Sequence, residues 1–105
     1  MTLSIMKKDN DLIKKLDAVI DPELNIPITE MGLVYGVEKT SDTTINVLMT
    51  LTTIGCPLYD VIHDDIVRVL KEDKNIKEVK IELTFDPPWS PEMMTDSAKL
   101  DVGFL

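Results

Sequence analysis

Two segments with alternating apolar residues, 44–52 and 76–85, flank a helical apolar pattern, and this order leaves few possible folds. Apolar side chains occupy every second position of both segments: Ile45, Val47, Met49, Leu51, then Val79, Ile81, Leu83, Phe85. Such alternation is typical of a β-strand with one buried face. Residues from 57 to about 72 instead place apolar side chains at helical spacing. A strand–helix–strand unit of this kind makes its two strands parallel neighbours with a right-handed connection.

Further elements complete the predicted domain. Residues 33–39 form another candidate strand, with Leu33, Tyr35 and Val37 on one face. The short polar stretch after it makes this strand antiparallel to 44–52. Residues 9–20 carry one apolar helical face, and short helical segments follow Ser90 and Thr95. We expect an α+β fold with two layers in the order helix, strand, strand, helix, strand, in which a small three-stranded mixed sheet packs against helices. The 105 residues suit one domain, 1–105, with 1–8 as a loose lead-in.

Composition narrows the partners and the compartment. The formal net charge of −8 argues against binding to nucleic acid and against docking on anionic lipid. No apolar run approaches the ~20 residues of a membrane span, and the start lacks a secretory signal. The single cysteine cannot form an internal disulfide, which favours a reducing, cytoplasmic compartment.

The single cysteine, Cys56, lies in a Gly-Cys-Pro turn between the second strand and the following helix. Pro57 suits the first position of a helix, so we expect Cys56 at the N-cap. The positive end of the helix dipole lowers a cysteine pKa at that position and favours the thiolate. The simpler alternative is a small buried hydrophobic residue. Thr52 offers a hydroxyl nearby, either to orient a thiolate or to finish the strand.

The predicted topology brings three unusual segments to one edge of the sheet. The strand before Cys56 and the strand before residues 86–89 are parallel, and the loop 21–32 precedes the antiparallel strand. Their ends therefore meet, provided that all three strands share one sheet.

Four side chains in these two loops are candidates for a site. Asp21 and Glu23 belong to the first loop, although turn and helix-end hydrogen bonding explains them more simply. Asp86 and Trp89 belong to the second loop, and Trp89 fits a cover over the core as well as a binding surface.

Several kinds of chemistry are disfavoured. His63, the only histidine, lies seven helical residues after Cys56, a rise of ~10 Å, so a Cys–His catalytic pair is not expected. A lone cysteine does not supply the four thiolates of a cluster site. Two copies of the chain could supply two thiolates, and a client protein or a small thiol could supply the rest. Any iron or iron–sulfur cluster would thus be transient or shared between subunits, with none tightly bound by a monomer, and we do not expect an enzyme.

Four motifs follow one another along the chain: Asp21-Pro22-Glu23, Met31-Gly32-Leu33-Val34-Tyr35, Met49-Thr50-Leu51-Thr52 with Gly55-Cys56-Pro57, and Asp86-Pro87-Pro88-Trp89-Ser90-Pro91-Glu92-Met93. In combination they closely resemble the SufT/PaaD-like family of metal–sulfur cluster biosynthetic proteins, which is related to the eukaryotic cytosolic iron–sulfur targeting factor. The resemblance extends from about residue 9 to residue 105.

The resemblance implies a domain similar to the C-terminal domain of NifU-type scaffolds. It also implies an accessory role in maturing iron–sulfur clusters or delivering them to client apo-proteins, with an iron–sulfur scaffold as a further partner and a homodimer as one possible state. The family cysteine falls on Cys56, the acidic loop motif on Asp21 and Glu23, and the second Asp-Pro motif on Asp86, beside Trp89. Unlike NifU-type domains, the chain has no second cysteine next to the first.

The alternative function is an interaction adaptor that recruits clients through the Trp89 loop, with a structural Cys56. A PaaD-like accessory to a multicomponent oxygenase belongs to this alternative. Relatives of that kind usually carry an additional cysteine-rich C-terminal part. This chain lacks such a part, so the SufT-like branch is favoured. A thiol transferase fits less well, because neither a nearby base nor a resolving cysteine is present.

Overall fold

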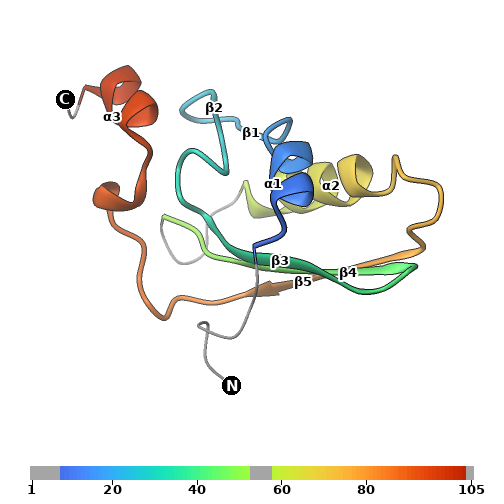
Figure 1. Cartoon of the computed structure of the whole chain (residues 1–105). Helices are drawn as coiled ribbons and strands as arrows, with labels where there is room; N and C mark the ends of the chain where they lie inside the picture. The colour runs from blue at the N-terminus through green and yellow to red at the C-terminus, as the bar shows by residue number, and fades with distance from the viewer. Residues whose placement is uncertain (1–7, 53–57, 104–105) are drawn as a thin grey trace.

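The computed structural model describes residues 8–52 and 58–103, and its elements follow the predicted order. They are α1 (Asn10–Leu16), β1 (Ile20–Asp21), β2 (Ile26–Pro27), β3 (Val34–Ser41), β4 (Thr44–Met49), α2 (Tyr59–Leu70), β5 (Glu78–Leu83), a 3₁₀ helix (Pro91–Met93) and α3 (Asp96–Val102). The main sheet has the order β3-β4-β5, with β3 antiparallel and β5 parallel to β4. Figure 1 shows α1 and α2 together on one side of this sheet. The predicted α+β class and mixed sheet are confirmed.

The hydrophobic core lies between the sheet and these two helices. Its fully buried members include residues from both layers: Leu16, Ile45, Val47, Met49, Ile62, Ile66 and Leu70. The inward side chains of β5 pack against this core but stay half-buried, because β5 is the edge strand. The alternation predicted for β4 and β5 is therefore confirmed, and the two strands pair in register from Thr44 with Glu78 to Met49 with Leu83.

The first helix ends earlier than predicted. Oδ1 of Asp9 caps its start by accepting from the backbone N–H of Asp11 at 2.9 Å and of Leu12 at 3.2 Å. The helix stops at Leu16 and not at Ile20, because Ile20 pairs with β2 in a separate small sheet.

The segment 21–32 is predicted to be a loop, but part of it is β-structure. Asp21 of β1 pairs with Ile26 of β2, and Ile20 pairs with Pro27, in a two-stranded antiparallel sheet.

The start of β3 contains a bulge that changes which side chains face the core. The register between β3 and β4 shifts between Val34 and Gly36, so Val34 and Val37 are both buried. Tyr35 turns to the opposite side and is half-exposed. The prediction that Leu33, Tyr35 and Val37 share one face is therefore wrong for Tyr35. At its other end β3 reaches Ser41, which leaves a two-residue turn before β4.

The second helix begins two residues later than predicted. Leu58 has φ −91° and ψ 0°, outside the helical region, and is the N-cap of α2. The predicted N-cap at Cys56 is therefore wrong, and Cys56 and Pro57 themselves lie outside the described residues. The C-terminal helix matches its prediction, because Oγ1 of Thr95 caps α3 and Gly103 ends it with φ 88°.

Within residues 8–52 and 58–103, no helix is both long and apolar enough to cross a membrane.

Candidate functional site

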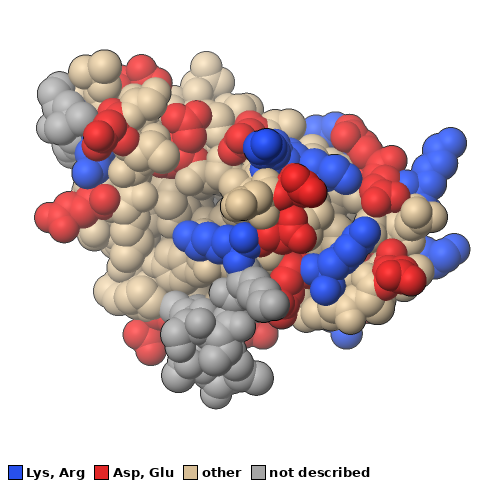
Figure 2. All heavy atoms as spheres, viewed as in Figure 1, with Lys and Arg blue, Asp and Glu red and all other residues tan. Residues whose placement is uncertain are grey.

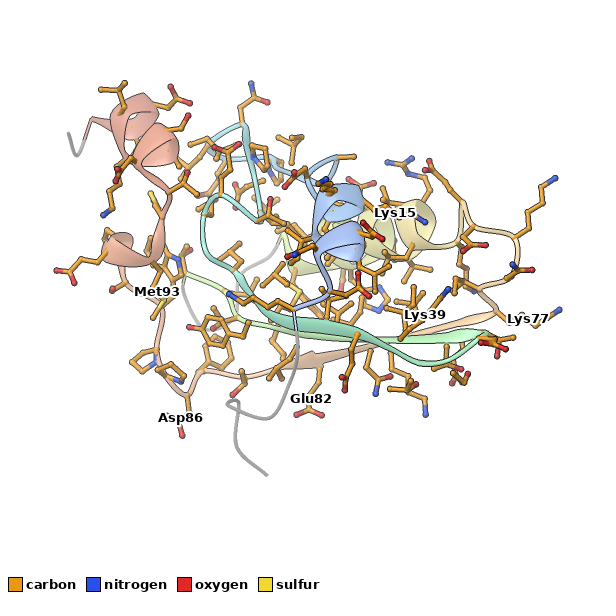
Figure 3. The ribbon with its side chains drawn as sticks, in the orientation of Figure 1. Lys15, Lys39, Lys77, Glu82, Asp86 and Met93 are labelled. Atoms are coloured by element: carbon orange, nitrogen blue, oxygen red, sulfur yellow. The ribbon has the colours of Figure 1, made fainter. Side chains whose placement is uncertain are left out.

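The candidate site lies at the end of the main sheet where β4 and β5 finish and β3 begins. The strands stay joined beyond their formal ends: the backbone N–H of Thr50 donates to the carbonyl of Leu33 at 2.8 Å, and that of Thr84 donates to Met49 at 2.9 Å. Backbone hydrogen bonds therefore connect β3, β4 and β5 at the end of the sheet where the site is predicted. Figure 3 shows Asp86 and Met93 at this end of the molecule.

Asp21 organises the turn between β1 and β2. Its Oδ1 accepts from the backbone N–H of Glu23 at 2.8 Å and of Leu24 at 3.1 Å. Its carbonyl oxygen accepts from the N–H of Asn25 at 2.7 Å, and Asn25 adopts the left-handed conformation with φ 59°. The Asp21 side chain is buried and thus serves its own turn, whereas Glu23 is exposed.

The chain after β5 crosses the loop before β3 and is fixed to it. We call residues 86–94 the strap. The indole N–H of Trp89 donates to the carbonyl of Met31 at 2.7 Å, and the ring is half-buried against the core. Beyond the strap, the N–H of Thr95 donates to the carbonyl of Glu30 at 2.8 Å. The structure thus brings Trp89 onto the loop that also contains Asp21.

Gly32 lies where the backbone of this loop packs closely against the strap. Its φ of 79° lies in the left-handed region, which glycine adopts more easily than other residues. A Cβ built on Gly32 would lie 2.5 Å from the carbonyl oxygen of Met93. The two backbones therefore touch directly, and only glycine fits without a shift of one of them.

Tyr35 is a site residue to which the sequence prediction gave no role. Its hydroxyl donates to the carbonyl of Pro87 at 2.8 Å and lies 3.6 Å from Sδ of Met93, so it holds the strap from the strand side. Burial raises the pKa of this phenol above its usual 10.0, and a hydrogen bond with the buried Thr50 opposes part of that shift. The motif that ends at Tyr35 was the only feature of the sequence that could have indicated this role. The orientation of the side chain depends on the β3 bulge, which the sequence pattern does not predict.

The remaining predicted residues do not join into one cluster. Thr52 and Asp86 are exposed, and in Figure 3 the Asp86 side chain points away from the body of the protein. Among the described residues no three His, Cys, Asp or Glu side chains are grouped to hold a metal ion. Asp21, Glu23 and Asp86 therefore do not form a metal site by themselves. Cys56, the predicted metal ligand, lies outside the described residues.

Within the part of the chain that the structure describes, no side chain caps the first turn of α2. Its N-cap residue, Leu58, has no polar side chain and cannot itself supply the usual side-chain acceptor. Asp60 in the first turn supplies one negative charge near this positive end. His63 follows one turn later with a partly exposed side chain, whose Nδ1 lies 3.3 Å from Oδ1 of Asp64.

Comparisons with known proteins agree with this architecture. The family model described as "Iron-sulfur cluster assembly protein" matches residues 9–83. An Fe-S protein maturation auxiliary factor from Porphyromonas gingivalis is 37% identical over 105 residues, which cover all of both chains. The Fe-S protein maturation auxiliary factor SufT of Staphylococcus aureus is 41% identical over 85 residues, which cover 81% of this chain and 97% of that protein.

A solved structure has the same fold. The crystal structure of a DUF59 domain from Bacillus anthracis superimposes with a TM-score of 0.84 and 38% identity. The superposition covers 91% of this chain and 92% of that domain.

Proposed function

The chain belongs to the iron–sulfur cluster assembly protein family, and from this membership we propose that it is a non-enzymatic accessory factor that matures iron–sulfur proteins. In this role it delivers clusters to client apo-proteins or helps a scaffold to do so. The observation that carries the proposal is the similarity to the Porphyromonas gingivalis maturation factor, which runs through the full length of both chains. It therefore includes the strap and α3 as well as the sheet.

The proposed chemistry centres on the thiolate of Cys56. This residue belongs to the connection between Thr52 and Leu58, where it would contact iron, a cluster or a client cysteine. The apolar N-cap residue of α2, Leu58, supports this role, because the positive end of the helix dipole favours negative charge and the N-cap side chain offers none. A thiolate and an anionic cluster both meet that condition.

The other residues receive supporting roles. Exposed Thr52 and Asp86 are available to an incoming client or to iron, with Glu23 exposed on the neighbouring loop. Asp21 shapes that loop through its turn hydrogen bonds. Trp89 forms a wall, because its indole N–H is already engaged by Met31.

Transient binding follows from the ligand supply. One cysteine offers one thiolate, and a cluster ordinarily takes four cysteine ligands. The described residues add no group of three metal-binding side chains. We therefore propose that a second subunit, a scaffold or the client itself completes the ligand set during transfer.

The test compares wild type with Cys56→Ser after anaerobic purification and loading with iron and sulfide. Ser97→Ala, at an exposed position of α3, is the matched control. Wild type and the control should bind iron with thiolate-to-iron absorption and pass it to an apo-client, whereas Cys56→Ser should fold equally well and do neither. Full transfer by Cys56→Ser would remove the thiolate from the mechanism and favour the adaptor function.

A further inference from the structure

A hollow lies at the opposite end of the sheet from the candidate site. It has a volume of about 400 Å³, and we call it the basic hollow; its lining residues are Lys39, Asp42, Thr43, Lys74, Asn75 and Lys77. Figure 3 shows Lys39 and Lys77 at this end and Asp86 with Met93 at the other. The hollow is therefore separate from the strap and from the start of α2.

The backbone beneath the basic hollow is tied together by hydrogen bonds. The N–H groups of Lys77 and Glu78 both donate to the carbonyl of Thr43, at 2.8 and 3.1 Å, which joins the β3–β4 turn to the start of β5. In the connection after α2, Oδ1 of Asp73 accepts from the N–H of Asn75 at 3.0 Å. The lining side chains thus extend from segments whose relative positions are fixed.

The charge of the basic hollow is opposite to that of the whole protein. Its lining includes three lysines and one aspartate, although the formal net charge of the chain is −8. Among the described residues the ion pairs involve His63 and Arg68 on α2, and none involves Lys39, Lys74 or Lys77. Figure 2 shows Lys and Arg side chains projecting from this end of the molecule, with acidic ones among them. The lysines therefore keep their positive charge available to a ligand.

We infer that the basic hollow binds a small phosphate-bearing molecule that also carries a hydroxyl group. The three ammonium groups supply positive charge for the phosphate, and the Asn75 amide supplies further N–H donors. Asp42 can only accept hydrogen bonds when ionised, so it suits a ligand hydroxyl. The volume falls in the ~300–1,000 Å³ range of small-molecule sites, and the polar lining disfavours an apolar ligand.

The net charge distinguishes a small anion from an acidic protein as the ligand. An acidic protein would extend beyond the three lysines and would be repelled by the rest of this chain's surface, because the chain carries a formal net charge of −8. A small anion inside the hollow responds mainly to the nearest charges, since salt screens exposed charges beyond ~8 Å at physiological ionic strength. The three lysines then outweigh the distant carboxylates.

The experiment is a ¹H–¹⁵N NMR titration of the full chain with glycerol 2-phosphate, inorganic phosphate, citrate and a glutamate-rich peptide. Glycerol 2-phosphate should cause saturable shifts of the amides of Thr43, Asn75 and Lys77. The double variant Lys39→Gln/Lys77→Gln should bind it about tenfold more weakly, as the loss of two exposed charge contacts predicts.

The matched control is Lys14→Gln/Lys15→Gln, which changes the net charge equally at two exposed positions of α1 and should leave binding unchanged. In Asp42→Asn, glycerol 2-phosphate should lose affinity relative to inorganic phosphate, because only the former carries alcohol hydroxyl groups beyond its phosphate.

Four results would overturn the inference: no saturable shifts in wild type, equal weakening in both double variants, tighter binding of citrate, or binding of the glutamate-rich peptide alone. None of these results bears on iron binding by Cys56, because phosphate binding and iron loading are assayed separately.

Discussion

Substitution of Gly32 by alanine should detach the strap or destabilise the whole domain. Gly32 combines φ 79° with direct contact to the backbone of Met93, so Gly32→Ala adds a side chain where neither the conformation nor the space allows it. The variant therefore tests the contact on which the arrangement of the candidate site depends.

The magnitude follows from two separate costs. The left-handed conformation costs a non-glycine residue roughly 1–2 kcal/mol. The new Cβ would lie 2.5 Å from the carbonyl oxygen and 2.8 Å from Cβ of Met93, distances that require the backbone to move. Overpacking of this kind costs about 1–3 kcal/mol, so the sum is roughly 2–5 kcal/mol. A domain of this size is stable by about 5–15 kcal/mol, so the effect should be large.

The assay is urea unfolding followed by far-UV circular dichroism and by the fluorescence of Trp89, the only tryptophan. Gly103→Ala is the matched control, because Gly103 has φ 88° but nothing within 4 Å of its would-be Cβ. Gly32→Ala should unfold at much lower urea than Gly103→Ala, or its fluorescence transition should precede the loss of secondary structure. If both variants unfold together, and with coincident probes, the close approach of Gly32 and Met93 is refuted.

Three further perturbations test other contacts of the site. Asp21→Ala should lower the free energy of unfolding by about 1 kcal/mol, whereas Asp21→Ser should keep most of the wild-type stability because its hydroxyl can still accept a hydrogen bond. Equal urea midpoints for both variants would contradict the role of the Asp21 side chain in its turn. Trp89→Phe removes the donor to the Met31 carbonyl and should cost about 1–2 kcal/mol by circular dichroism; an unchanged midpoint would show that this bond contributes nothing. Because burial raises the folded-state pKa of Tyr35 above 10.0, the stability that this phenol contributes should be complete below pH 10 and decline as pH rises through the folded-state pKa. Thermal unfolding of Tyr35→Phe should show a smaller loss of stability at alkaline pH than wild type. Tyr59→Phe is a comparison, because the pKa of the Tyr59 phenol is also raised. An identical alkaline loss in Tyr35→Phe and wild type would contradict the raised pKa of Tyr35.

The main sheet was predictable because one face of each strand packs on the same core. Alternation identified β4 and β5, and the helical pattern between them fixed their parallel pairing. The bulge at Val34 and Gly36 left no such trace, since the apolar pattern of β3 reads the same in either register. The two-residue strands β1 and β2 are likewise too short to show a period.

The candidate site was predictable in outline but not in its contacts. Strand directions alone placed the loop before β3 beside the strap, and the Trp89–Met31 hydrogen bond joins them. The acceptor is a backbone carbonyl, which no residue type reveals. Pro57 suggested an earlier helix start, yet the backbone of Leu58 departs from the helical region and moves the N-cap. The role of Cys56 stays a prediction.

The measurement that bears most directly on the proposed function is cluster occupancy of iron–sulfur client enzymes in cells with and without this protein. Client activity and iron content, normalised to client abundance, should fall when the protein is removed and recover with the wild-type chain. Recovery should also occur with Ser97→Ala and should fail with Cys56→Ser, provided that the variant accumulates to the same level. Client occupancy that is unchanged by removal of the protein would contradict a role in iron–sulfur maturation.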